Sequence, residues 1–203
     1  PLGIFTAYRA GKRSDRYISY GLFTAASVPN FVLGLLLAVF LGVKLGWFPP
    51  LGYTSPSENF IEHIKTMTLP VLALSIPLIA SYTRLLRTDV IATLREDFVT
   101  MASSKGLSNR WILWRHVFRP SSATLMTAAA LNMAFLIGGA VIIEVIFALN
   151  GVGMLLNASI AQRQYLAIQS VIALIAVAFV IFNIIVDTLY TIVDPRVKAN
   201  RGS

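Results

Sequence analysis

Side chains that commonly carry out chemistry are few in this sequence. The chain has no cysteine and two histidines, His63 and His116, which are far apart and predicted to lie in separate loops. The absence of cysteine excludes a disulfide framework, a thiolate metal site and a cysteine nucleophile. Two distant histidines do not indicate a histidine metal cluster or a Ser/His/Asp arrangement. These residues argue against an enzyme and against a metal site on this chain.

Two carboxylates, Glu144 and Asp187, stand at the ends of long apolar runs. Ionisable groups near a membrane interior are functional candidates, but both residues are also compatible with an interfacial position or with pairing across helices. Glu144 precedes a turn at residues 150–153. Helical spacing places Asp187, Tyr190 and Asp194 near one face, and Pro195 favours the end of the helix at Asp194.

The elements that position these residues are long apolar segments. The chain has 203 residues, of which 56% are hydrophobic and 13% charged, and its mean hydropathy is +0.72. Four uncharged runs cover residues 17–43, 66–83, 120–143 and 164–186. Because roughly 20 helical residues cross a bilayer, we expect four spans, at about 17–43, 66–88, 120–147 and 164–192. Residues 1–8 are too short to span and lack the basic start of a signal peptide, so we interpret them as the end of an earlier span.

The positive charges are segregated along the chain. Fourteen of the 17 Lys and Arg residues fall before the first span, in the segment from Arg84 to Arg119, or in the tail. Lys and Arg accumulate in cytoplasmic loops. The net charge of +8 is therefore interpreted as a topology signal rather than a nucleic-acid surface, and it predicts a cytoplasmic C-terminus.

Polar and helix-breaking residues also occur inside the apolar runs. Pro29, Pro70 and Pro77 are expected to lie within membrane helices, where neighbouring helices can satisfy the freed carbonyls. Asn183 belongs to a set of small or polar residues that favours contacts between helices.

The loop at residues 89–119 is too long and too hydrophobic for a simple connector. Its apolar spacing predicts an amphipathic helix over residues 89–104. Gly106 interrupts that pattern, and Leu107-Ser108-Asn109 offers a second helix start. Two interpretations remain open on the pattern alone: a pair of helices at the lipid headgroups, or a docking element for a cytoplasmic partner.

Several segments of this sequence resemble one family. The run at residues 97–108, followed by His116-Val117-Phe118-Arg119-Pro120, is similar to the signature loop of ABC importer permeases of the dipeptide, oligopeptide and nickel group. Further similarity lies at Trp47-Phe48-Pro49, at residues 138–153 around Glu144, and at residues 183–196. Two departures are Thr100, where many relatives carry a charged residue, and Gln164, where the group usually has aspartate.

The resemblance implies an all-α integral membrane protein with the type I ABC importer permease (MetI-like) helix bundle, of which this chain is the last four to five helices of six. It implies that a coupling helix at the signature loop contacts an ATPase. The residues this assigns to coupling are Asp97, Phe98, Thr100, Met101, Ala102, Ser103, Ser104, Lys105, Gly106 and Leu107. Those assigned to a gate or to packing are Glu144, Gly151, Gly153, Asn183, Asp187 and Asp194.

The resemblance also implies a function and partners. The expected role is ATP-driven import of di- and oligopeptides across a bacterial or archaeal plasma membrane. The expected partners are a second permease, two ATP-binding subunits, an extracytoplasmic substrate-binding protein and lipid, without nucleic acid. The chain lacks a phosphate-binding loop, so ATP and Mg²⁺ are expected on the partners and no cofactor here. The alternatives are import of nickel or another small solute, an ATPase-independent transporter or channel, and a membrane scaffold.

Overall fold

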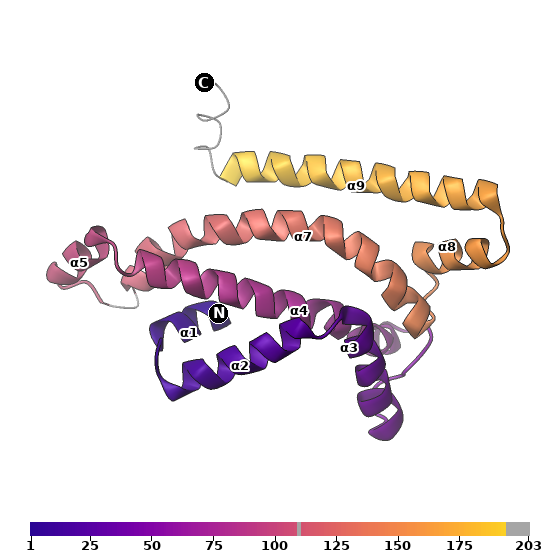
Figure 1. Cartoon of the computed structure of the whole chain (residues 1–203), viewed down its shortest axis with the longest axis horizontal. Coiled ribbons are helices and arrows are strands. Elements are labelled where there is room, and N and C mark those ends of the chain that lie inside the picture. The colour runs from indigo at the N-terminus through magenta and orange to yellow at the C-terminus, as the bar shows by residue number, and fades with distance from the viewer. Residues whose placement is uncertain (109–110, 194–203) are drawn as a thin grey trace. The chain divides into compact units, whose positions relative to one another are not determined.

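A computed structural model describes residues 1–108 and 111–193 of the chain. The described residues form helices joined by turns and loops, without a strand (Figure 1). They divide into two compact units: residues 1–27, 78–108, 111–131 and 187–193 in the first, Val28–Pro77 and Asn132–Val186 in the second. Three long helices contribute residues to both units, namely α4 (Phe60–Thr93), α7 (Phe118–Phe147) and α9 (Tyr165–Val193).

The first unit contains short helices packed on the C-terminal part of α4. These are α1 (Leu2–Tyr8), α2 (Arg13–Ser27), α5 (Asp97–Ser104) and the π-helical turn η2 (Ile112–Val117), which runs into α7. Their core joins Ile4 and Ala7 of α1 to Leu86 and Val90 of α4. Gly3 allows this approach, because a Cβ there would lie 3.0 Å from both Leu86 Cβ and Thr83 O.

The second unit contains α3 (Asn30–Leu37), the π-helical continuation η1 (Ala38–Lys44) and α8 (Val152–Ala161). Its core is built from Leu69 and Ala73 of α4 together with Ile143 and Phe147 of α7. Gly34 of α3 faces this core, and a Cβ at Gly34 would lie 3.3 Å from both Ile143 Cδ1 and Phe147 Cε2.

The prolines in the apolar runs behave differently from one another. Pro70 and Pro77 lie inside α4, as expected. The expectation for Pro29 is wrong, because the helix stops at Ser27 and restarts at Asn30. Pro29 has an extended backbone, with φ −58° and ψ 142°, and stands at the N-terminal cap of α3. Proline disfavours helical geometry at the preceding residue, which agrees with the interruption between α2 and α3.

Three long helices occupy parts of the chain where spans are expected. The helices α4, α7 and α9 fall at the expected spans of about 66–88, 120–147 and 164–192, and α4 begins earlier and ends later. That these helices cross a membrane stays a prediction. Within the described residues, α4 and the Tyr165–Ile185 part of α9 are each long and apolar enough to cross a membrane. The broken pairs α2 with α3–η1, and Gly139–Phe147 with α8, raise the number of candidate spans to at most four. His63 lies in α4 rather than in a loop.

Candidate functional sites: the α5 loop and the Glu144 cap

The α5 loop, residues 94–108, is anchored on one side of its helix. Val99 and Ala102 are 7% and 8% exposed. They pack into the core of the first unit together with Val90 of α4 and Ile112 and Val117 of η2. Their i, i+3 spacing places them on one face of α5, so that face is attached to the end of α4.

The other side of α5 is open. Phe98 and Met101 are 43% and 60% exposed, and Leu107 follows at 36%. Asp97, Thr100, Ser104, Lys105 and Gly106 are exposed as well, whereas Ala102 is buried and nothing is described of the Ser103 side chain. Apolar side chains in this open position resemble the centre of a protein interface more than a solvated helix face.

Gly106 ends α5 with a left-handed turn. Its φ is +76°, and a Cβ would meet no atom within 4 Å. The Leu107 N–H donates to the Ala102 carbonyl at 3.4 Å, the backbone bond that closes a Schellman cap. Glycine is therefore favoured by backbone conformation alone, which agrees with the expected turn at this position.

The expected single helix over residues 89–104 is wrong. The α4 helix runs on to Thr93, the chain turns, and α5 begins at Asp97. The Arg95 and Glu96 N–H groups donate to Ala92 and Thr93 carbonyls at 3.0 and 3.2 Å, three residues back. A straight helix would carry Val99 about 13 Å beyond Val90 at about 1.5 Å per residue, whereas the turn lets both enter one core.

The second helix of the loop is described from Trp111 onward, and two hydrogen bonds join its first residues to Ser108. The Trp111 N–H donates to Ser108 Oγ at 3.4 Å, and the Ile112 N–H donates to the Ser108 carbonyl at 3.0 Å. Ser108 thus provides an N-terminal cap. Helical structure follows as η2 and α7, so His116 lies in η2 rather than in an unstructured loop.

Glu144 caps α8 from a neighbouring helix. Its Oε2 accepts hydrogen bonds from the Gly153 N–H at 2.7 Å and the Met154 N–H at 3.2 Å. These are two of the first N–H groups of α8, which have no partner within their own helix. A carboxylate at this end also interacts favourably with the helix dipole. Glu144, Gly151 and Gly153 therefore form one local arrangement.

The two glycines permit the close approach of α8 to α7. A Cβ at Gly153 would lie 2.6 Å from Val141 Cα, a backbone atom that cannot swing aside. A Cβ at Gly151 would collide with the Glu144 carboxyl group. The two helices, Gly139–Phe147 of α7 and α8, meet at 79°.

Of the remaining predicted gate residues, only Asn183 has a described side chain. Asn183 Nδ2 donates to the Phe179 carbonyl at 2.8 Å, within α9 itself. Asp187 lies in the α9 backbone range, and nothing is described of its side chain. Asp194 lies outside the described residues.

An ion pair between Asp15 and Arg87 is not predicted from the sequence. Arg87 Nε and Nη2 donate to Asp15 Oδ1 and Oδ2, both at 2.8 Å. The Gly11 N–H also donates to Oδ2 at 3.0 Å, and Asp15 is 4% exposed. In the sequence, Arg87 contributes only to the charge distribution that predicts topology. The residue that could have indicated the ion pair is Asp15, because it is an acid within the basic segment that precedes the first span.

Comparison with known proteins gives a consistent result. The model of the family described as "Binding-protein-dependent transport system inner membrane component" matches residues 1–199. The chain is 34% identical over 97% of its length to a probable peptide ABC transporter permease of Sinorhizobium fredii. Over 98% of its length it is 34% identical to an oligopeptide transport system permease of Bacillus subtilis. Over 97% of its length it is 32% identical to a glutathione transport system permease of Escherichia coli.

The match covers these relatives only in part. The chain spans 63%, 63% and 61% of their respective lengths.

Proposed function

The chain belongs to the family of binding-protein-dependent transport system inner membrane components, and on that premise we propose that it serves as a permease segment of an ATP-driven importer of di- and oligopeptides. The three relatives named above are described as permeases for peptides, oligopeptides and glutathione. Glutathione is itself a tripeptide, so one substrate class accounts for all three names.

The single observation that carries the proposal is that α5 is buried on one side and exposed on the other. Val99 and Ala102 attach α5 to the core around Val90 of α4, while Phe98 and Met101 remain open. In the proposed mechanism, an ATP-hydrolysing subunit covers the open face and displaces α5 during its cycle. Because close-packed cores transmit strain, the displacement reaches the end of α4. Alternating access then follows from rigid-body movement of packed helices.

The proposed assembly includes components that this chain does not contain. They are a second permease, two ATP-binding subunits and an extracytoplasmic substrate-binding protein. ATP and Mg²⁺ belong to the ATP-binding subunits, and this chain binds no cofactor. In the proposed orientation, the basic segments before α2 and around α5, together with the C-terminus, face the cytoplasm.

The test uses the complete transporter in proteoliposomes. Met101→Glu places a charge in the centre of the open face of α5, and we expect substrate-stimulated ATP hydrolysis and import to fall together by at least tenfold. Ile61→Glu is the matched control, since Ile61 is similarly exposed at 66% but lies at the start of α4. Import that continues without ATP, or equal effects of the two variants, would contradict the proposal.

A further inference from the structure

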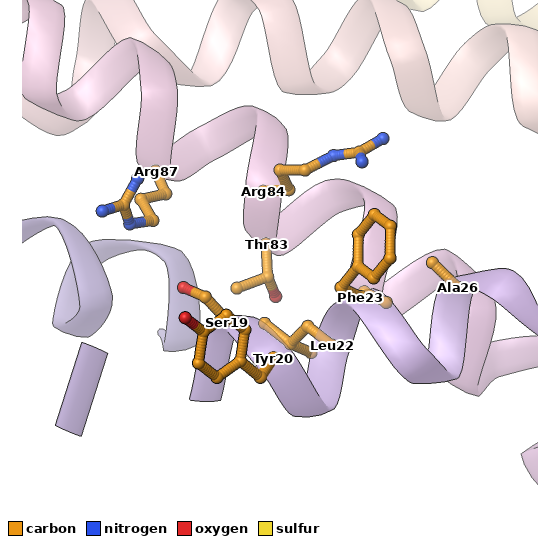
Figure 2. A pocket seen from close by; sticks show the side chains of 9 residues that line it. Ser19, Tyr20, Leu22, Phe23, Ala26, Thr83, Arg84 and Arg87 are labelled. Atoms are coloured by element: carbon orange, nitrogen blue, oxygen red, sulfur yellow. The ribbon is translucent and has the colours of Figure 1, made fainter. Parts of the chain in front are cut away.

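A cavity of about 420 Å³ lies between α2 and α4 in the first unit (Figure 2). This volume is within the range of about 300–1,000 Å³ that is common for small-molecule sites. The cavity belongs neither to the α5 loop nor to the Glu144 cap. Its lining residues are Ser19, Tyr20, Leu22, Phe23, Ala26, Ala80, Thr83, Arg84 and Arg87.

The walls of the cavity are largely apolar. Leu22, Phe23 and Ala26 come from α2, and Ala80 and Thr83, which are 2% and 6% exposed, come from α4. Phe23 is 66% exposed, so a large ring lies beside the cavity without being covered. An apolar occupant would remove this surface from water or fill a gap against the bilayer.

The two arginines of the cavity have different partners. Arg87 is held by Asp15 through both carboxylate oxygens. Arg84, one helical turn away, is exposed. Its guanidinium has no hydrogen-bond or ion-pair partner in the part of the chain that the structure describes. The two side chains extend from α4 in opposite directions (Figure 2), which leaves Arg84 as a cationic group beside an apolar cavity.

The apolar walls and the cationic Arg84 together favour an anionic amphiphile as the ligand of the cavity. No lining residue is an aspartate or glutamate, so a ligand ammonium group, such as a peptide N-terminus, would find no counter-ion there. A negatively charged headgroup beside Arg84 would be neutralised, and its hydrocarbon chain would match the apolar walls. Basic pockets between membrane helices are a known setting for anionic lipid headgroups.

We propose that this cavity binds one anionic phospholipid, with its phosphate at Arg84 and an acyl chain along Leu22, Phe23 and Ala26. The site requires that the chain lies in a membrane and that lipid reaches the cavity in the complete transporter. It does not depend on coupling to an ATPase, and the leaflet it occupies follows from the proposed orientation.

The experiment compares lipid retention in the complete transporter. The complex is reconstituted in nanodiscs with equal phosphatidylglycerol and phosphatidylcholine, released into mild detergent, and examined by native mass spectrometry. We expect one phosphatidylglycerol to be retained preferentially on the wild type. Arg84→Gln should lower that retention about fivefold, the effect of about one basic contact.

Two further variants separate the parts of the site. Ala26 is exposed, so Ala26→Phe can fill the cavity without disturbing a packed core, and it should reduce retention of both lipids. Arg16→Gln removes the same charge from an exposed position of α2 outside the lining, and it should retain phosphatidylglycerol as the wild type does.

Three results would overturn the inference. The first is equal retention of the two lipids by the wild type. The second is wild-type retention by both Arg84→Gln and Ala26→Phe. The third is a crosslink from a photoreactive phenylalanine analogue at Phe23 to a protein subunit instead of lipid, which would identify the cavity as a protein interface. None of these results depends on import, so the proposed function is tested separately.

Discussion

At the residue scale, the clearest constraint is the contact of Gly153 with the backbone of Val141. A Cβ at Gly153 would lie 2.6 Å from Val141 Cα, so Gly153→Ala requires α8 to shift away from α7. We expect a loss of stability of about 1–3 kcal/mol, as for other overpacked sites, seen as a lower Tm of the purified complex.

Gly139→Ala provides the matched control for this prediction. The nearest atoms to a Cβ at Gly139 are 3.7 and 3.8 Å away, which is ordinary contact. We expect its Tm to equal or exceed that of the wild type, because alanine favours helix. Equal losses in the two variants would contradict the packing argument.

A second prediction at the residue scale concerns the ion pair between Asp15 and Arg87. Asp15→Asn or Arg87→Gln leaves a charged partner in a site where the side chains are only 6% and 30% exposed. Each single variant should cost about 1.5–3 kcal/mol, as for hydrogen bonds to charged groups. The stability loss of the double variant should be clearly smaller than the sum of the losses of the two single variants, because no unpaired charge remains.

The Lys65–Glu62 pair serves as the reference for Asp15–Arg87. Its side chains are 47% and 41% exposed, so Lys65→Gln should change stability by about 0.5 kcal/mol or less. Thermal unfolding of the purified complexes measures all four variants. Additive effects of Asp15→Asn and Arg87→Gln would mean that the pair is not coupled.

At the element scale, the α5 loop depends on the turn at Gly106. A β-branched residue there is strained at φ +76°, by about 1–2 kcal/mol. Gly106→Val should therefore unwind the end of α5 and reduce substrate-stimulated ATP hydrolysis several-fold. Gly106→Asn should be milder, since asparagine tolerates this conformation.

Gly46→Val separates local strain from a role of the α5 loop. Gly46 has a φ of +64°, and a Cβ there would meet no atom within 4 Å, so the backbone cost is similar in a different segment. ATPase stimulation should remain near that of the wild type. Loss of stimulation in Gly46→Val as well would assign the effect to general destabilisation.

The helices are predictable from the sequence to the extent that local signals decide them. The turn at Gly106 and the cap at Ser108 follow from residue type and position. The break between α4 and α5 does not, because the spacing of Val90, Leu94, Phe98 and Met101 continues one helical face across it. The core that Val90, Val99 and Ala102 share decides the break. Similarly, the sequence points to Glu144 and to the glycines at 151 and 153, but a cap between two helices depends on tertiary geometry.

At the scale of the whole molecule, orientation in the membrane is the property that charge distribution predicts. Because residues 1–203 contain no cysteine, a single introduced cysteine is the only thiol among them. With a membrane-impermeant maleimide applied to intact spheroplasts, Lys44→Cys should be labelled, and Lys105→Cys should be labelled only after permeabilisation. Both residues are exposed. Labelling of Lys105→Cys from outside would reverse the proposed topology.

The central claim is that the open face of α5 contacts an ATP-hydrolysing subunit, and crosslinking from Met101 tests it most directly. In the complete transporter, Met101→Cys supplies the only thiol of this chain, which a short maleimide–succinimide reagent can join to lysines of a neighbour. We predict a crosslink to the ATP-hydrolysing subunit from Met101→Cys and none from Ile61→Cys. No such product from Met101→Cys, or equal yields from both positions, would contradict the account.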